Sequence, residues 1–162
     1  MSIPKIIHYC WFGGGAISPE NRKCMESWKK YCPDYKIIEW NEQNFDIGTN
    51  RYAQQAYEAK KYAFVSDYVR LAVLYEYGGI YLDTDVELVR PLDELLELPG
   101  FMGFQNNNEV ATGLGFGARK GNPVVQALLR DYDALDFLKA DGSVDLTPCP
   151  ERSTKVLQAL GV

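Results

Sequence analysis

Two carboxylates separated by one residue, Asp83 and Asp85, are the side chains of this sequence best suited to chemistry. Apolar and polar residues alternate over residues 80–86, which predicts a strand with Tyr81 and both acids on one face. On an extended chain the two carboxylates would lie about 7 Å apart. Acids this close raise each other's pKa unless a cation or hydrogen-bond donors lie between them. The pair therefore predicts a site for Mg²⁺ or Mn²⁺, completed by water and substrate phosphate oxygens.

A helix is expected between Tyr62 and the Gly78-Gly79 pair, because glycine favours a helix C-terminus. Asp67 and Arg70 stand three residues apart on this helix and so share a face. By themselves they could form a surface ion pair worth at most about 1 kcal/mol. Their place just before the two acids favours a pocket shared with them. The predicted buried stripe of the helix, at three- and four-residue spacing, consists of Phe64, Tyr68, Leu71, Leu74 and Tyr75.

The residues before this helix predict a β-helix-β unit, which usually forms a parallel strand pair. Residues 4–12 and 35–40 are apolar enough for strands, and Ser18-Pro19-Glu20 is typical of a helix start. The fold class expected is α/β, with a central, mainly parallel sheet, helices on both faces and the acids at a strand's C-terminal end. Further expected elements are a polar loop at 41–50, a weak helix at 52–61, a helical turn at 92–98, strands at 101–105 and 113–118, and helices after Asn122-Pro123 and Thr147-Pro148.

Composition limits the function classes. A chain of 162 residues suits one domain over residues 1–162, and a net charge of −5 argues against nucleic-acid binding. No apolar run approaches the roughly 18 residues of a membrane span, and no signal peptide precedes Ile3. The four cysteines lack C-x-x-C spacing, so buried free thiols are expected. We therefore expect a cytoplasmic protein without a transmembrane segment, with contact to a membrane surface left open.

The first predicted strand ends at Trp11-Phe12, followed by Gly13-Gly14-Gly15. These glycines match neither G-x-G-x-x-G nor the P-loop pattern, which excludes the standard dinucleotide and Walker sites. Their place at a strand's end still suits close approach to a ligand. By residue type alone, Trp11 is expected in the core. His8, the single histidine, is expected to be structural.

The stretch Ser66-Asp67-x-x-Arg70, followed by Leu74-Tyr75-x-x-Gly78-Gly79-Ile80-Tyr81-Leu82-Asp83-x-Asp85, resembles the DXD-containing region of glycosyltransferase family 32. That family includes yeast initiating α-1,6-mannosyltransferases and bacterial capsule sugar transferases, and the glucosylating cytotoxins carry a similar block. The resemblance extends weakly from Ile3 to about Pro123. It implies a GT-A fold and a metal-dependent transfer of sugar from a nucleotide-sugar donor, with retained anomeric configuration, to a hydroxyl of a glycan or lipid-linked glycan.

The resemblance also implies roles for individual residues. Asp85 would contact the metal directly, and Asp83 would contact the ribose or metal-bound water. Trp11, in an Ile-x-x-x-W-x-G segment from Ile7 to Gly13, would stack on the nucleotide base. Asp67 and Arg70 would hold sugar hydroxyls and the diphosphate, since a guanidinium suits phosphate oxygens, and Tyr81 would complete the donor site. Similarity to the UDP-glucose-using toxins favours a UDP-sugar over the GDP-mannose of the yeast relatives.

One departure from the family pattern leaves an alternative open. Family members continue to a C-terminal segment with His and Trp near the diphosphate, whereas this chain ends at Val162. A truncated enzyme, or a non-catalytic sugar-nucleotide-binding domain that partners a longer transferase, would fit. Phosphatases of the haloacid dehalogenase type also place Asp-x-Asp after a strand, usually near the N-terminus and with Thr or Val two residues later. Here Glu87 occupies that position, which disfavours the phosphatase.

Overall fold

The computed structural model describes residues 2–162 and contains a five-stranded sheet in the order β2-β1-β3-β5-β4. β1 (Ile6–Cys10) is parallel to its neighbours β2 (Lys36–Trp40) and β3 (Gly79–Tyr81). β5 (Val110–Ala118) is antiparallel to both β3 and β4 (Gly100–Phe104). Of these strands, β5 alone therefore runs opposite to the other four. This arrangement confirms the predicted α/β fold with a mainly parallel sheet.

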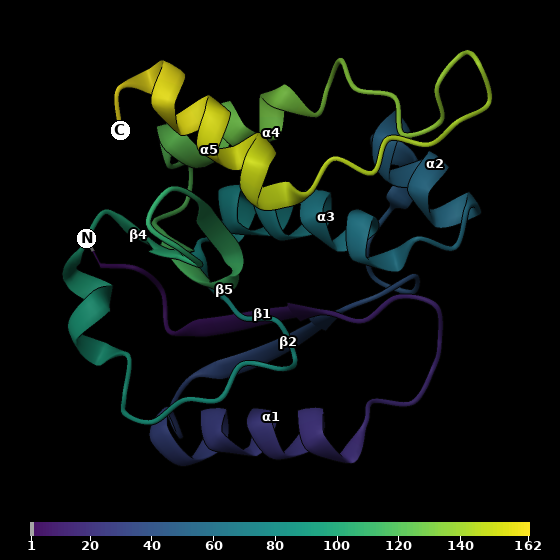
Figure 1. Cartoon of the computed structure of the whole chain (residues 1–162). Coiled ribbons are helices and arrows are strands. Elements are labelled where there is room, and N and C mark those ends of the chain that lie inside the picture. Colours follow the sequence, from purple (N-terminus) through teal and green to yellow (C-terminus); the bar gives the residue numbers. More distant parts are fainter. Residues whose placement is uncertain (1) are drawn as a thin grey trace.

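Helices cover both faces of the sheet (Figure 1). α1 (Pro19–Tyr31) lies on one face, and its start is as predicted, because the Ser18 hydroxyl accepts a hydrogen bond from the Asn21 amide. α3 (Tyr62–Tyr77) lies on the other face, next to α2 (Arg51–Glu58). α4 (Pro123–Asp131) and α5 (Cys149–Leu160) pack beyond α3. The short 3₁₀ helices η1 (Ile47–Thr49) and η2 (Asp93–Glu97) complete the elements.

α3 is the central helix of the molecule. It is buried on more sides than a single stripe predicts, because the sheet, α2 and α4 all contact it. Val65, Leu71 and Leu74 are fully buried, whereas Phe64 and Tyr75 of the predicted stripe are only partly buried. Its end is as predicted: Gly78 and Gly79 have φ of 70° and 121°. A Cβ at Gly79 would lie 2.8 Å from the Ile6 carbonyl oxygen, so β3 can approach β1 only with glycine there.

The predicted strand over residues 80–86 is wrong in its second half. β3 ends at Tyr81, and the acid pair lies in a turn that is closed by the Val86 amide donating to the Asp83 carbonyl at 3.1 Å. Leu82, Thr84 and Leu88 are buried whereas Asp85 and Glu87 are exposed, so burial alternates along this segment although it forms no strand.

α1 holds the segment that follows the turn. The Trp28 indole N–H donates to the Val86 carbonyl at 2.8 Å, and the Leu88 amide donates to the Ser27 hydroxyl at 2.8 Å. These backbone groups therefore bond to side chains of a helix instead of to a neighbouring strand. That competition explains why the apolar pattern continues past residue 81 while the strand does not.

His8 has the structural role expected of it, and the expected burial of the free thiols holds for three cysteines but not for Cys24. Nδ1 of His8 accepts from the Trp40 indole at 3.0 Å, and Nε2 donates to the Gly78 carbonyl at 2.8 Å. Burial lowers the pKa of His8, partly offset by the Gly78 bond. All four thiols are free: Cys10, Cys32 and Cys149 are buried, and Cys24 is partly exposed. Within residues 2–162, no helix is long and apolar enough to cross a bilayer.

Candidate active site

A cavity of about 790 Å³ opens at the C-terminal ends of β1 and β3, beside the first residues of β5. Open α/β sheets bind ligands at this edge because loops follow the strands there. The six residues predicted from the sequence to form the site all line this one cavity; they are Trp11, Asp67, Arg70, Tyr81, Asp83 and Asp85. They come from the loop after β1, from α3, and from β3 and its following turn.

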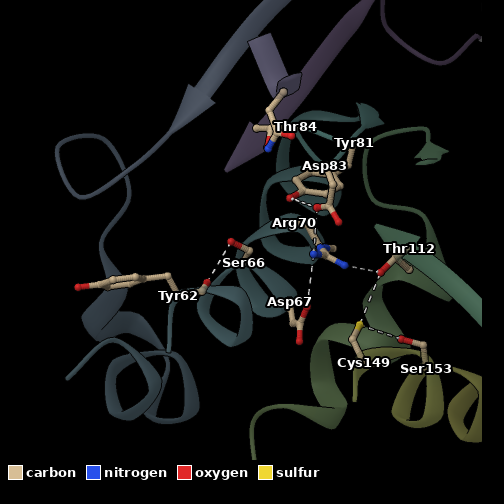
Figure 2. Close-up of polar contacts among 11 residues, drawn as sticks. Tyr62, Ser66, Asp67, Arg70, Tyr81, Asp83, Thr84, Thr112, Cys149 and Ser153 are labelled. Atoms are coloured by element: carbon tan, nitrogen blue, oxygen red, sulfur yellow. Dashed lines mark hydrogen bonds and ion pairs between the residues drawn. The ribbon is translucent and has the colours of Figure 1, made fainter. Parts of the chain in front are cut away.

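Arg70 is the hub of the site (Figure 2). Its Nη2 lies 3.2 Å from Oδ1 of Asp83 and 3.3 Å from Oδ1 of Asp67, and its Nη1 donates to the Thr112 hydroxyl at 3.0 Å. The guanidinium also lies over the Tyr81 ring, 4.9 Å from its centroid. Arg70 is 6% exposed, so these contacts are made largely out of water and orient the group strongly.

Asp67 and Arg70 form a buried ion pair, so the interpretation of these two residues as a surface ion pair is wrong. Asp67 is 9% exposed. Burial raises its pKa to about 6, although Arg70 opposes that shift by favouring the ionised form. A buried pair contributes little net stability over an apolar equivalent, but removing one partner leaves an uncompensated charge. Its presence on a core helix is therefore better explained by function than by folding.

Asp83 is held by three groups. Oδ1 accepts from the Tyr81 hydroxyl at 2.9 Å as well as from Arg70, and the backbone amide donates to the Gly113 carbonyl at 3.1 Å. Oδ2 and Cγ face the α-carbon of Gly113, where a Cβ would lie only 3.1 Å from Cγ. Glycine at 113 is thus required for this position of the carboxylate, whose side chain is still 38% exposed.

Asp85 differs from Asp83 in being exposed, and among residues 2–162 its carboxylate has neither an ion pair nor a hydrogen bond. Thr84 between them is buried, and its hydroxyl accepts from the Asn21 side chain at 2.9 Å. The turn is therefore fixed through Thr84 by α1, which leaves Asp85 directed to solvent at the cavity.

Trp11 lies beside the glycine loop. Its indole N–H donates to the Gly15 carbonyl at 2.6 Å, and its ring lines the cavity. The loop is held from outside by the Glu42 carboxylate, which accepts from the Gly13 amide, and by the Tyr62 ring against Gly13. Trp11 is partly exposed and does not belong to either apolar core of the protein, contrary to what residue type alone favours.

These residues fit a divalent cation that takes few protein ligands. Among residues 2–162, no cluster of three or more His, Cys, Asp or Glu side chains could enclose a metal by itself. Asp85 offers a free carboxylate, and Asp83 offers the oxygen not engaged by Arg70 and Tyr81. Mg²⁺ and Mn²⁺ sites of this kind are completed by water and substrate phosphates.

Comparison with known proteins identifies the family. The sequence profile described as "Glycosyltransferase sugar-binding region containing DXD motif" matches residues 18–101, that is, 84 of 162 residues. The chain belongs to this glycosyltransferase family. The match includes Asp67, Arg70, Tyr81, Asp83 and Asp85 but not Trp11.

Relatives agree with this placement. Inositol phosphoceramide mannosyltransferase 3 of Schizosaccharomyces pombe is 30% identical over 151 residues, covering 84% of this chain and 39% of that protein. The uncharacterized glycosyltransferase L373 of Acanthamoeba polyphaga mimivirus is 30% identical over 155 residues, covering 87% of this chain and 62% of that protein. The chain therefore spans less than two thirds of either relative.

A solved structure supports the fold. The PaToxG glycosyltransferase superimposes with a TM-score of 0.69 at 21% identity, covering 98% of this chain and 69% of that chain. At this identity the similarity shows the architecture alone. It agrees with the GT-A-type fold that the resemblance implied.

Sequence reasoning missed the residues that hold the acids in place. Thr112 and Gly113 of β5 and Asn21 of α1 touch Arg70, Asp83 and Thr84 from elements distant in the sequence. One signal was available: glycines recur at 113, 115 and 117, and glycine inside a strand often marks the close approach of another group. No comparable signal singled out Asn21, whose neighbours are ordinary helix-start residues.

Proposed function

We propose that this chain is a metal-dependent retaining glycosyltransferase that moves a sugar from a nucleotide-sugar donor to an acceptor hydroxyl. The observation that carries the proposal is the cavity wall itself. The buried Asp67–Arg70 pair holds Asp83 at the end of β3, next to Asp85, whose carboxylate has no partner among residues 2–162, and all four residues lie in the region that the family profile matches. Such an arrangement serves charge stabilisation better than it serves the stability of the fold.

In the reaction, the bond between the sugar's anomeric carbon and the diphosphate oxygen breaks, the acceptor oxygen bonds to that carbon, and the acceptor's proton passes to the departing diphosphate. As the first bond breaks, negative charge builds up on the diphosphate. A bound Mn²⁺ or Mg²⁺ would neutralise part of that charge. Asp85 would hold the cation directly, and Asp83 would hold the ribose or a water on the cation. Departure and attack on one face would retain the configuration, as the family resemblance implies.

Trp11, Asp67, Arg70 and Tyr81 would bind the donor. The Trp11 ring offers a surface on which a base can stack, and stacking tolerates any base. Asp67 and Arg70 lie deeper on the same wall, where the sugar and diphosphate would meet them. Replacing either should reduce turnover more than it reduces binding of the bare nucleoside diphosphate.

The donor expected first is a UDP-sugar, on the resemblance to the glucosylating toxins. A mannosyl donor is the second candidate, because relatives are named as inositol phosphoceramide mannosyltransferases. Those names also favour a lipid-linked acceptor, reached by contact with a membrane surface, and the free thiols agree with a cytoplasmic location.

Titration of UDP and GDP, each with Mn²⁺ or with EDTA, tests the proposal by calorimetry. We expect binding that requires Mn²⁺, tighter for UDP, and lost in Asp85→Ala while the far-UV circular dichroism spectrum is unchanged. Metal-independent binding, or equal Mn²⁺–UDP affinity in Asp85→Ala, would contradict the assignment. Turnover is then followed with a UDP-sugar and with GDP-mannose. Binding without hydrolysis or transfer of any donor would favour the non-catalytic binding domain.

A further inference from the structure

The third contact of Arg70 is with a residue that neither the motif nor the family block includes. Thr112 lies on β5, opposite α3, and is 1% exposed. Its hydroxyl oxygen accepts from Nη1 of Arg70 at 3.0 Å and lies 3.6 Å from Sγ of Cys149, which in turn lies 3.5 Å from the Ser153 hydroxyl (Figure 2). The hydroxyl therefore connects the hub of the site to the start of α5.

The Thr112 contact affects how two carboxylates compete for the guanidinium of Arg70. Nη2 of Arg70 is shared between Asp67, which is on the same helix, and Asp83, which is on another element, at 3.3 and 3.2 Å. Asp67 is the more buried carboxylate and stands only three residues away, so it holds the guanidinium without any long-range packing. An acceptor for Nη1 on the β5 side holds the plane of the guanidinium so that Nη2 also reaches Asp83.

The alternative contacts of Arg70 do not orient it in this way. The Nε atom is buried without a partner among the described residues, and the Tyr81 ring lies against the face of the guanidinium. A stacked ring allows the planar group to rotate within its own plane, whereas a hydrogen bond from Nη1 does not. The Tyr81 ring and the Nε atom therefore leave the rotation of the Arg70 guanidinium within its plane undetermined, and the hydrogen bond to Thr112 fixes it.

We propose that Thr112 is a positioning residue of the transferase site. Its hydroxyl orients Arg70 so that Asp83 is held against Gly113, with one carboxylate oxygen directed to the cation and ribose. The role of Asp83 in that statement rests on the proposed function, whereas the orienting of Arg70 by Thr112 does not.

The first test needs no ligand. In nuclear magnetic resonance spectra of the ¹⁵N-labelled protein, rotation about the Cζ–Nε bond of Arg70 is measured from the exchange of its Nη signals. We expect slow exchange in the wild type and in Thr112→Ser, and at least about tenfold faster exchange in Thr112→Val. Unchanged exchange in Thr112→Val would overturn the proposal. If Thr112→Val does not fold, Thr112→Ala carries the same measurement.

The second test uses Mn²⁺ with UDP, or Mn²⁺ with GDP if UDP does not bind. We expect about tenfold weaker binding in Thr112→Val and restoration to within about twofold of the wild type in Thr112→Ser. The matched control is Thr154→Val, which also removes a hydroxyl that ties α5 to β5, at 3.0 Å from the Val110 amide, but has no contact with Arg70. We expect wild-type binding in this control.

These two tests separate the proposals. Equal affinity in Thr112→Val and the wild type would refute the positioning role, as would an equal loss in Thr154→Val. Failure of the wild type to bind either nucleotide with Mn²⁺ would refute the proposed function instead. The exchange of the Arg70 signals would then still decide whether Thr112 orients the guanidinium.

Discussion

Gly113→Ala is expected to damage the site while sparing the fold. Gly113 does not have the positive φ that disfavours other residues, so its backbone accepts alanine. The new Cβ would meet the Asp83 carboxylate, with Cγ at 3.1 Å. Carbon atoms in contact normally lie about 3.5–4.0 Å apart, and Oδ2 would lie even closer to the new Cβ than Cγ does, so the carboxylate must move by at least about 0.5–1 Å.

The size of the effect follows from the two bonds that Asp83 would lose. The Tyr81 and Arg70 bonds measure 2.9 and 3.2 Å, so a shift of this size away from Gly113 weakens or breaks both of them. Bonds to a charged group contribute about 1.5–3 kcal/mol each, and water replaces part of that here because the Asp83 side chain is 38% exposed. A net loss of about 2 kcal/mol corresponds to roughly thirtyfold weaker binding of Mn²⁺–UDP.

Stability should change much less. Replacing glycine by alanine at a compatible position typically stabilises by about 0.4–1 kcal/mol, because the unfolded chain has fewer conformations. This gain offsets part of the loss around Asp83, so Tm should stay within a few degrees of the wild type. Gly103→Ala is the matched control: a strand glycine whose nearest atoms would lie 4.0 Å from the new Cβ.

Calorimetric titration and thermal unfolding of both variants check the reasoning. We expect Gly103→Ala to bind as the wild type does. Wild-type affinity in Gly113→Ala would show that the position of Asp83 does not matter. A large fall in Tm would show instead that Gly113 serves the fold.

Three other perturbations test the site's surroundings. The pKa of Asp67 is raised from 3.8 to about 6, so between these two pH values the folded protein binds more protons than the unfolded chain does. The contribution of Asp67 to stability therefore falls as the pH rises through this window. The unfolding free energy of the wild type relative to Asp67→Asn, measured in urea, should therefore increase from pH 6 to pH 4; a constant difference would contradict the shift. Arg70→Lys should lose Mn²⁺–UDP affinity by at least about tenfold, because an ammonium cannot span Thr112 and two carboxylates at once; unchanged affinity would argue against the hub. Trp28→Phe should lower stability by about 2–3 kcal/mol, because it removes the bond to the Val86 carbonyl and leaves a cavity where the fully buried indole packs. Faster hydrogen exchange near residues 84–88 should accompany it.

The sequence alone predicts the elements well where local signals are strong. Ser18, Gly78 and Asn122 each mark a helix end that the structure contains. The β-helix-β unit gives the parallel pair of β1 and β2 because crossover connections favour it. β5 begins at Val110, three residues before the predicted start at 113, because Val110 and Ala111 pair with Phe104 and Gly103 of β4, a long-range contact that leaves no local signal.

The acid pair shows where such reasoning fails. Alternation over 80–86 predicts a continued strand, but Trp28 and Ser27 satisfy the backbone of this segment from α1. The alternation of apolar and polar residues shows which side chains are buried. It does not show whether the backbone of the segment pairs with a neighbouring strand or bonds to the side chains of a helix. The same limit hid Thr112, whose role depends on the packing of β5 against α3. Long-range partners of this kind leave no periodic trace in a single sequence.

The charges of the cavity give an independent reason to expect metal dependence. The charged residues that line it are Asp67, Asp83, Asp85 and Arg70, three acids against one base. Arg70 is already shared by two of the carboxylates, so it cannot by itself offset the added charge of a nucleoside diphosphate. A diphosphate entering alone would face exposed Asp85 and partly exposed Asp83 without compensation, and like charges at short range repel even where solvent weakens the interaction. A divalent cation between Asp85 and the diphosphate would reverse the sign of that interaction. By linkage, the nucleotide would then strengthen metal binding by the same factor. This explains how a site with two carboxylates, and no enclosing ligand cluster among the described residues, could still hold Mn²⁺ during the reaction.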